Sequence, residues 1–219
     1  KKIMKRIQAL SKRTKGIHTL LDIGTDHGYL LIDALKNNHI KKGIAADIND
    51  QPLNNARINI EKAGLSKDVI FRLSDGFKQI DLDYDGVVIA GMGMHLVKSI
   101  LMQPHKEPKK YIVSVHTHID QFRHFLSSSG FTIVDEDVVF EKFYYIIFTL
   151  IKKVTHLTDN EVYLGPFLKH KYEALPYYQH LLKINEKISK SAPKEKVEYL
   201  EVQNKWLKTA IQQLNVSKN

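Results

Sequence analysis

The sequence predicts an α/β fold: a seven-stranded, mostly parallel sheet followed by a C-terminal helical hairpin. Short apolar runs typical of buried strands alternate five times with segments typical of helices. Two strand-rich runs at 131–140 and 143–151 are separated by only two residues, which predicts an antiparallel hairpin. Beyond residue 154, apolar residues recur at helical spacing.

The first strand and the turn after it are the central feature of the chain. Leu20, Leu21, Asp22 and Ile23 form a buried strand that ends in a glycine-bracketed turn over 24–28, and a helix is expected over 29–35. Glycine lets the backbone turn sharply and lets a ligand approach closely. The helix N-terminus behind the turn offers free N–H groups. This unit is typical of nucleotide-binding sheets.

A second strand over 43–49 carries an acid about 20 residues after the turn. At the end of that strand, Asp47 can accept both ribose hydroxyls of a nucleoside. The alternative is that Asp47 is a solvated cap of the next helix.

The middle of the turn distinguishes two ligands. A dinucleotide places its pyrophosphate on a G-x-G-x-x-G turn. Here Asp26 stands at the second glycine position, where its carboxylate would repel a pyrophosphate. Asp26 suits a ligand with a sulfonium cation and an amino acid tail, which favours S-adenosylmethionine. The terminal antiparallel hairpin favours the same donor, since dinucleotide dehydrogenases more often end in a parallel strand.

The remaining elements follow in order. We expect a helix from Pro52 to Ala63, strands over 69–76, 86–93 and 111–115, and helices over 95–102 and 118–128. An amphipathic helix over 3–14 would place Ile3, Ile7 and Leu10 on one face, beside the strand ends.

The C-terminal part is expected to be helical. A short helix is predicted over 159–170, and a looser apolar stripe with Pro176 near its start follows. The last segment has spacings of three and four residues, which predict a coiled-coil seam: Val197, Leu200, Asn204, Leu207, Ile211 and Leu214. These patterns divide the chain into a catalytic domain, 1–155, and a helical coiled-coil domain, 156–219.

Charge is concentrated in the flanks of the chain. The net charge is +9; residues 1–20 hold seven bases and no acid, and residues 156–219 hold ten bases and seven acids. Basic flanks around a neutral sheet suit a phosphate-backbone substrate; the alternative is a role in solubility alone. There is no cysteine, and no apolar run approaches the length of a membrane span.

Four segments of the chain resemble the bacterial tRNA (adenine(22)-N(1))-methyltransferase (TrmK-type) family. They are Asp22-Ile23-Gly24-Thr25-Asp26-His27-Gly28-Tyr29-Leu30, Ala46-Asp47-Ile48-Asn49, Arg72-Leu73-Ser74-Asp75-Gly76 and Ala90-Gly91-Met92-Gly93. The resemblance extends over almost the whole chain. It implies the Rossmann-like class I methyltransferase sheet, S-adenosylmethionine as donor and tRNA as substrate. The chain departs from the family at Ser114-Val115-His116, where Gln-Pro-Asn is usual, and at Gly28, where Ala is usual.

The strand ends and the resemblance together predict the residues that contact the donor. They are Asp22, Gly24, Thr25, Asp26, His27, Gly28, Asp47, Ile48, Asn49, Ser74, Asp75, Gly76, Ala90, Gly91 and Met92.

The chemistry expected at the site is methylation of adenine N1, whose in-plane lone pair needs alignment more than deprotonation. Asp26 is the catalytic candidate, because a carboxylate would stabilise the cationic product; it could instead be a helix cap. The expected RNA contacts are Lys5, Arg6, Lys12, Arg13 and Tyr144. Tyr144 could stack on a base, or it could belong to the core, as aromatic residues in a hairpin more often do. No histidine spacing indicates a metal.

Two alternatives stay open. A methyltransferase of the same fold could act on another RNA or a small molecule, or the chain could bind RNA or a partner without catalysis. Intact Gly24, Asp47 and Asp75 favour an enzyme. We expect a cytoplasmic monomer that binds tRNA. It is expected to bind neither a membrane nor a metal.

Overall fold

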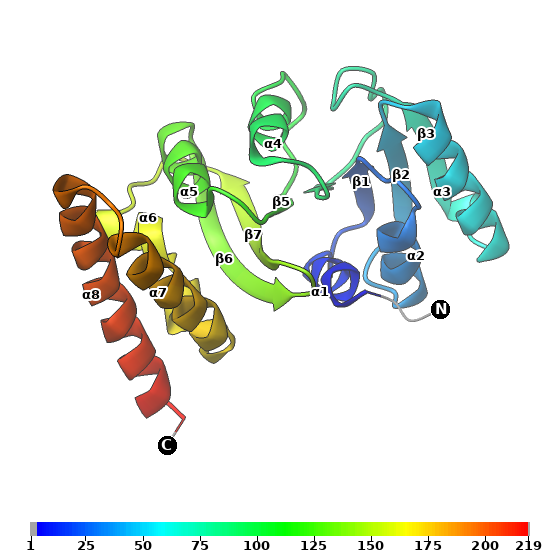
Figure 1. The fold of residues 1–219 in the computed structure, drawn as a ribbon. Helices are drawn as coiled ribbons and strands as arrows, with labels where there is room; N and C mark the ends of the chain where they lie inside the picture. Colours follow the sequence, from blue (N-terminus) through cyan, green and yellow to red (C-terminus); the bar gives the residue numbers. More distant parts are fainter. Residues whose placement is uncertain (1–3, 219) are drawn as a thin grey trace.

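A single mixed sheet of seven strands is the framework of the protein (Figure 1). The computed structural model describes residues 4–218. The strand order is β3-β2-β1-β4-β5-β7-β6, and it reverses direction between β1 and β4. The first five strands are parallel, and β7 runs antiparallel to both of its neighbours, β5 and β6. The strands are β1 (Thr19–Ile23), β2 (Lys42–Asp47), β3 (Val69–Leu73), β4 (Gly86–Ile89), β5 (Lys110–Val115), β6 (Phe131–Phe140) and β7 (Tyr144–Lys152).

The sheet confirms the predicted fold class, with shorter strands than expected in three places. The expected strands over 43–49, 69–76 and 86–93 end at Asp47, Leu73 and Ile89. The polar and glycine residues after each of these ends form loops instead, and those loops line the pocket described below.

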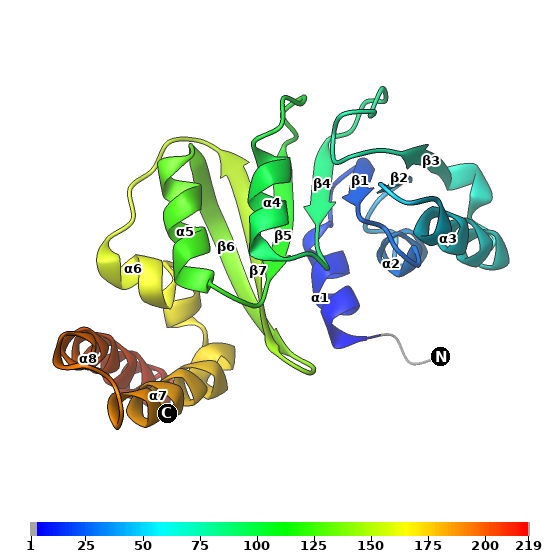
Figure 2. The same cartoon turned by 45° about the horizontal axis from the view of Figure 1, so that its top comes forward.

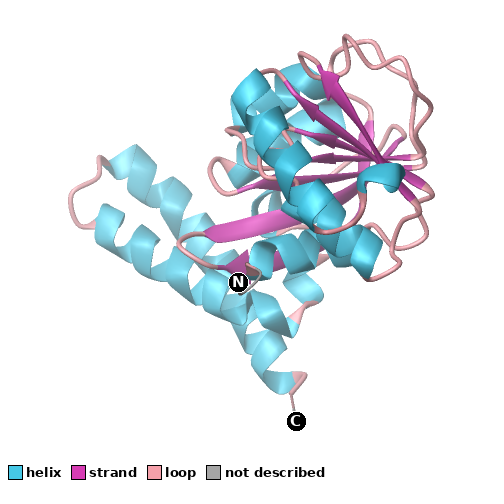
Figure 3. Cartoon of the chain, turned by 90° about the vertical axis from the view of Figure 1, so that its right-hand side faces the viewer, coloured by secondary structure: helices cyan, strands magenta, loops and turns pink. Residues whose placement is uncertain are grey.

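Helices cover both faces of the sheet (Figures 2 and 3). They are α1 (Lys5–Arg13), α2 (Tyr29–Lys36), α3 (Asp50–Lys62), α4 (Met94–Leu101), α5 (Ile119–Ser128), α6 (Asp159–Leu164), α7 (Leu175–Ser189) and α8 (Lys194–Val216). One buried core joins the sheet to α1, α2 and α3, and the other joins it to α4, α5 and the C-terminal helices. The strands are apolar on both sides because both sides are covered.

The N-terminal helix packs as expected beside the strand ends, over a shorter span than 3–14. Leu10 is fully buried in the core on that side, whereas Ile3 lies outside the described residues. In its last turn, Arg13 forms ion pairs with Asp135 and Asp137 of β6. Lys171 contacts the same two carboxylates at 2.7 and 3.0 Å. One acidic pair therefore joins the N-terminal helix to the C-terminal region.

The helix predicted over 159–170 is wrong in its length. It ends at Leu164, because Gly165 takes a φ of +95° and lies directly over a buried ion pair. A Cβ at Gly165 would fall 2.6 Å from both Arg123 Nη2 and Glu136 Oε1, so only glycine fits. A short 3₁₀ turn (Leu168–His170) follows.

The ion pair under Gly165 anchors the C-terminal helices to the sheet. Arg123 Nε donates to Glu136 Oε2 at 2.8 Å, and both side chains are fully buried. The other Glu136 oxygen accepts the backbone N–H groups of Phe167 and Leu168, at 3.0 and 3.1 Å. Arg123 also donates to the carbonyl oxygens of Val162 and Tyr163.

The two long C-terminal helices pack side by side, as the spacing predicts (Figure 3). The buried stripe of α8 differs in part from the expected seam, since Gln203 and Ala210 are buried while Asn204 and Ile211 are half-buried. The reason is that α8 packs against α6 as well as α7. None of the helices within residues 4–218 is long and apolar enough to cross a membrane.

Candidate active site

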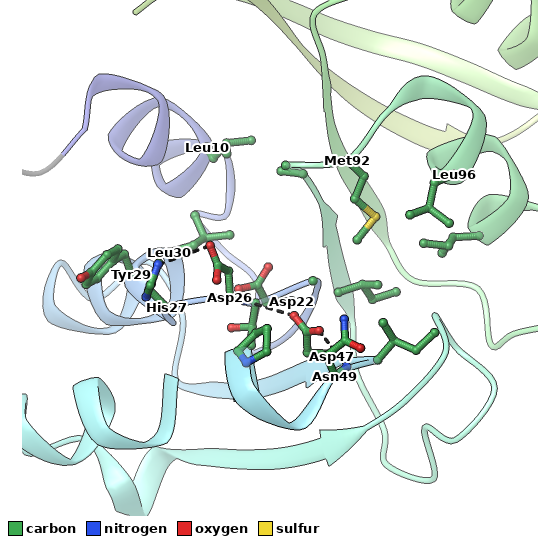
Figure 4. Close-up of a pocket in the computed structure, with 18 of the residues that line it drawn as sticks. Leu10, Asp22, Asp26, His27, Tyr29, Leu30, Asp47, Asn49, Met92 and Leu96 are labelled. Atoms are coloured by element: carbon green, nitrogen blue, oxygen red, sulfur yellow. Dashed lines mark hydrogen bonds and ion pairs between the residues drawn. The ribbon is translucent and has the colours of Figure 1, made fainter. Parts of the chain in front are cut away.

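A pocket of about 370 Å³ lies where the strand order reverses, outside the carboxyl ends of β1, β2 and β4 (Figure 4). This is the position at which open α/β sheets bind ligands. Fourteen of the fifteen expected donor residues line it. They are Asp22, Gly24, Thr25, Asp26, His27, Asp47, Ile48, Asn49, Ser74, Asp75, Gly76, Ala90, Gly91 and Met92.

Gly28 is the expected residue that does not line the pocket. It is the N-cap of α2, with a φ of +74°, and a Cβ there would lie 3.2 Å from Ala56 Cβ and Ile60 Cδ1. Its contribution is therefore the close approach of α2 to α3. The N-cap position of α2 is thus occupied by a glycine, which has no side chain to offer, and Asp26 lies two residues before it.

Asp26 itself is held in an uncommon conformation for a residue with a side chain. Its φ is +51°, in the left-handed region that Asp tolerates better than most residues. Its carboxylate is 66% exposed, and one oxygen lies 3.6 Å from His27 Nε2. Figure 4 shows this carboxylate beside His27, across the pocket from Met92.

Asp47 ends β2 with its carboxylate fixed by the backbone. One oxygen accepts the Asn49 N–H at 3.1 Å, and the other accepts the Asp26 N–H at 3.4 Å. Each carboxylate oxygen keeps a lone pair for a further donor. The alternative of a solvated helix cap is excluded, since Asp47 is buried and lies two residues before the N-cap of α3.

Asp22 is the buried acid of the pocket, only 4% exposed at the end of β1. Burial raises the pKa of Asp22 to about 7, and the negative charges of Asp47 and Asp26 act in the same direction. Within residues 4–218, no lysine or arginine forms an ion pair with any of these three carboxylates. The pocket therefore concentrates negative charge that a cationic ligand would relieve.

The rim of the pocket is apolar. Three of its lining residues are exposed apolar side chains: Ile48 is 60% exposed, Leu96 51% and Met4 45%. Met92 reaches across the turn, so that a Cβ at Gly24 would lie only 2.4 Å from its Cε. Rims of this kind suit the flat faces of nucleobases.

The N-terminal helix supplies one wall, which sequence reasoning placed only in general terms. Met4, Arg6, Ile7 and Leu10 line the pocket. The spacing of Ile7 and Leu10 was the available signal, but it could not tell a helix packed on the sheet from one that also closes a ligand site.

Four of the five expected RNA-binding residues lie on α1. Lys5 and Lys12 are exposed on α1, whereas Arg6 is half-buried in the pocket wall. Arg13 is engaged in the ion pairs with β6 described above.

Tyr144 lies elsewhere. Its ring packs 5.4 Å from Tyr177 and 5.2 Å from His180, both on α7, and it does not line the pocket. Side chains alternate between the two faces of a strand, so Tyr144 shares the face of Ile146 and Phe148, whereas Tyr145 lies on the face of α1. Over residues 4–218 no group of three or more His, Asp or Glu side chains is arranged to hold a metal ion.

A mixed seven-stranded sheet with an acid-lined pocket at its switch point defines the Rossmann-like S-adenosylmethionine-dependent methyltransferases. Within that class, the chain belongs to the tRNA (adenine(22)-N(1))-methyltransferase (TrmK) family, whose model matches residues 20–216. Family membership gives the reaction class, which is S-adenosylmethionine-dependent methylation of N1 of an adenine in tRNA.

Three relatives illustrate the match. The tRNA (adenine(22)-N(1))-methyltransferase of Bacillus subtilis is 28% identical over 217 residues, covering 89% of each chain. The structure of Mycoplasma capricolum TrmK with S-adenosylhomocysteine has a TM-score of 0.80 and 29% identity, covering 98% of both chains. A Streptococcus pneumoniae protein in complex with S-adenosyl-L-methionine has a TM-score of 0.83 and 27% identity, covering 96% of this chain and 100% of that one.

Proposed function

We propose that this chain methylates N1 of adenine 22 of tRNA, and that three carboxylates divide the work of binding the donor and stabilising the product. The observation that carries the proposal is the charge of the pocket. Asp22, Asp26 and Asp47 line one cavity without a lysine or arginine partner in the described chain. Such a cavity favours a ligand with a sulfonium and an ammonium group over an anionic dinucleotide.

Asp47 and Asp22 are the donor-binding acids in this proposal. The Asp47 carboxylate is preoriented by two backbone N–H groups, which leaves it ready to accept ribose hydroxyls. The buried Asp22 carboxylate faces the part of the pocket beside Gly24, where an amino acid tail can approach the backbone. When bound, S-adenosylmethionine supplies a methyl group on a positively charged sulfur.

The protein's main task toward the RNA is alignment, because adenine N1 has a free lone pair. Leu96 and Met92, which follow β4, and Met4, which precedes α1, offer an apolar rim on which the adenine can lie. As the new N–C bond forms, positive charge moves onto the base. The exposed Asp26 carboxylate stabilises that charge and can accept the proton that the cationic base later releases.

Replacement of Asp26 tests this division of roles. Asp26→Asn keeps the shape of the side chain, and asparagine tolerates the left-handed conformation, so the fold and the turn are retained. We expect single-turnover methyl transfer to slow by about 100-fold with donor and tRNA saturating, because a charge that stabilises the transition state is lost. Donor affinity measured by calorimetry is expected to change much less.

The matched control is Asp50→Asn, which removes an exposed acid from the first turn of α3 outside the pocket. Its transfer rate is expected to equal that of the wild type. An Asp26→Asn rate equal to the control rate would limit Asp26 to shaping the turn. Mass-spectrometric mapping of the product shows whether adenine 22 or another nucleotide is methylated. Methylation of metabolites but not of tRNA would favour the small-molecule alternative.

The exposed lysines of α1, Lys5 and Lys12, are proposed phosphate contacts, since they are free of acidic partners within residues 4–218. We further propose that the enzyme acts as a monomer in the cytoplasm, where tRNA is modified. Light scattering with and without tRNA tests the monomer.

A further inference from the structure

Three aromatic side chains form a cluster beside the donor pocket without lining it: His116, Phe143 and Tyr145. The rings of His116 and Phe143 are stacked, with centroids 5.0 Å apart and an interplanar angle of 19°. Tyr145 lies 5.1 Å from His116. We call these three residues the aromatic cluster.

The sheet places the aromatic cluster at the same edge as the pocket. His116 follows β5, and Tyr145 and Phe143 stand at the start of β7, whose Ile146 pairs with Val115 at the end of β5. Because β5 is parallel to β4 and β1, these residues lie at the carboxyl edge of the sheet. Figures 1 and 2 both show the tip of the β6–β7 hairpin next to α1.

Arg6 connects the aromatic cluster to the pocket. It lines the pocket, and its guanidinium lies 4.7 Å from the centroid of the Tyr145 ring. Its backbone N–H donates to Glu141 in the hairpin turn at 2.9 Å, while its buried Nε has no hydrogen-bond partner in the described chain. The aromatic cluster is therefore one residue away from the donor pocket.

The outer end of the aromatic cluster is open. Phe143 is 44% exposed. It lies in the hairpin turn, outside the paired residues of β6 and β7, whose last pair is Phe140 and Tyr144. Lys142 Nζ lies 5.4 Å from the Phe143 ring. A partly exposed aromatic ring with Lys142 beside it, and with Arg6 at the next ring of the cluster, matches an unstacked nucleotide, because the base can stack on the ring while its phosphates lie by the cations.

We propose that Phe143, supported by His116, stacks on the nucleobase next to the methylated adenine in the RNA strand. The target adenine belongs at the pocket rim, and Arg6 and Tyr145 separate that rim from Phe143, so the neighbouring nucleotide is the occupant. Phe143 is thus a positioning residue that holds the strand while the adenine is extruded. The proposal rests on the proposed function, because it requires RNA at the pocket.

Phe140 provides a matched control on the same hairpin. It is 53% exposed, and its ring lies 4.7 Å from Tyr144, on the face of the C-terminal helices. Phe143→Leu and Phe140→Leu remove the same number of atoms from two partly exposed sites on opposite faces. We expect Phe143→Leu to lower kcat/KM for tRNA by between about fivefold and a hundredfold. Phe140→Leu should change it less than twofold, and Phe143→Tyr should restore it.

The decisive experiment combines these variants with RNA that lacks one base. Wild-type product is first mapped on intact tRNA, so a failure of the proposed function is seen there, and the abasic sites are then placed on either side of the nucleotide actually methylated. If Phe143 stacks on the base of a nucleotide next to the methylated one, removal of that base lowers kcat/KM of the wild type. The same abasic RNA should not lower kcat/KM of Phe143→Leu any further. Donor affinity and thermal unfolding verify that the variants are folded.

Three results would overturn the proposal. In the first, Phe143→Leu and each abasic site lower kcat/KM independently, so that their effects multiply at both positions. In the second, neither abasic site lowers wild-type kcat/KM. In the third, Phe143→Leu has as little effect on kcat/KM as Phe140→Leu.

Discussion

At the scale of single residues, Asp22 has the strongest coupling between structure and pH. It is buried without a cation, so its folded-state pKa of about 7 lies well above the ordinary 3.8. Between these values the folded chain holds a proton that the unfolded chain has released. The contribution of Asp22 to the free energy of unfolding of the donor-free protein therefore falls as pH rises from about 4 to 7. The total fall is about 4 kcal/mol, and the contribution is constant above pH 7.

Replacement of Asp22 makes this effect measurable. We expect Asp22→Asn to raise the melting temperature of the donor-free protein at pH 8 but not at pH 4, because the wild type is already neutral at the lower pH. In the wild type, affinity for the cationic donor should rise as pH increases through 7, and this rise should be absent in the variant. Unfolding and calorimetry at several pH values provide both readouts.

Asp33 supplies the control for Asp22. It is a buried acid of α2 that does not line the pocket, so Asp33→Asn should leave the pH dependence of donor binding unchanged. A rise of wild-type affinity with falling pH would refute the assignment of Asp22 as a donor-binding acid.

At the scale of elements, the connection between α5, β6 and the loop after α6 depends on one ion pair with no solvent exposure. Glu136 accepts hydrogen bonds from two backbone N–H groups as well as from Arg123. It therefore holds the loop after α6 in place and also compensates the charge of Arg123. Removal of one member of a buried pair leaves the other uncompensated, which costs more than the pair itself contributes.

We expect Arg123→Met to lower the free energy of unfolding by about 3–5 kcal/mol, because it leaves a buried carboxylate unpaired. The double variant Arg123→Met/Glu136→Gln should recover part of the loss, since Gln keeps an oxygen for the Phe167 and Leu168 N–H groups. Urea unfolding measures both. The control is the pair of half-buried Arg72 and exposed Asp81: Arg72→Met should have little effect. Equal losses for the two arginine variants would contradict a special role for burial.

At the scale of the whole molecule, one core extends across the expected boundary at residue 155. Leu168, Tyr178 and Leu207 belong to the same buried cluster as Phe148 of β7 and Phe122 of α5. The C-terminal helices therefore share a buried core with the sheet and are not joined to it by a flexible linker alone.

This continuity predicts a single unfolding transition. Trp206 is the only tryptophan of the chain and lies in α8, so its fluorescence follows the C-terminal helices alone. We expect its thermal transition to coincide with the loss of donor binding by the sheet. Two separate transitions would show that residues 1–155 and 156–219 are independent units. A chain ending at residue 155 should fail to unfold cooperatively, because it exposes the side of the core that Leu168, Tyr178 and Leu207 cover.

Sequence patterns predicted the sheet and the acids of the pocket well because both depend on local periodicity. Strands buried on both faces appear as continuous apolar runs, and an acid or glycine at the end of each run marks the carboxyl edge. The residues expected to contact the donor line one pocket for the same reason, since they stand at or directly after the strand ends.

What the patterns did not predict depends on register and on distant contacts. Tyr144 and Tyr145 are adjacent aromatic residues, and only the pairing of β7 with β5 decides which of them faces α1. Arg123 and Glu136 are ordinary charged residues in an amphipathic helix and a strand, so nothing local indicates that both are buried. The break at Gly165 follows from that burial and was missed with it.

The unpaired carboxylates of the pocket have a further consequence for turnover. Methyl transfer takes a positive charge away from sulfur and leaves it on the RNA base, so the spent donor is a neutral thioether. On the proposed roles, Asp22 and Asp47 would attract the departing ligand less than they attract a fresh one. Exchange of spent for fresh donor would then be favoured electrostatically after each reaction, without any movement of the protein.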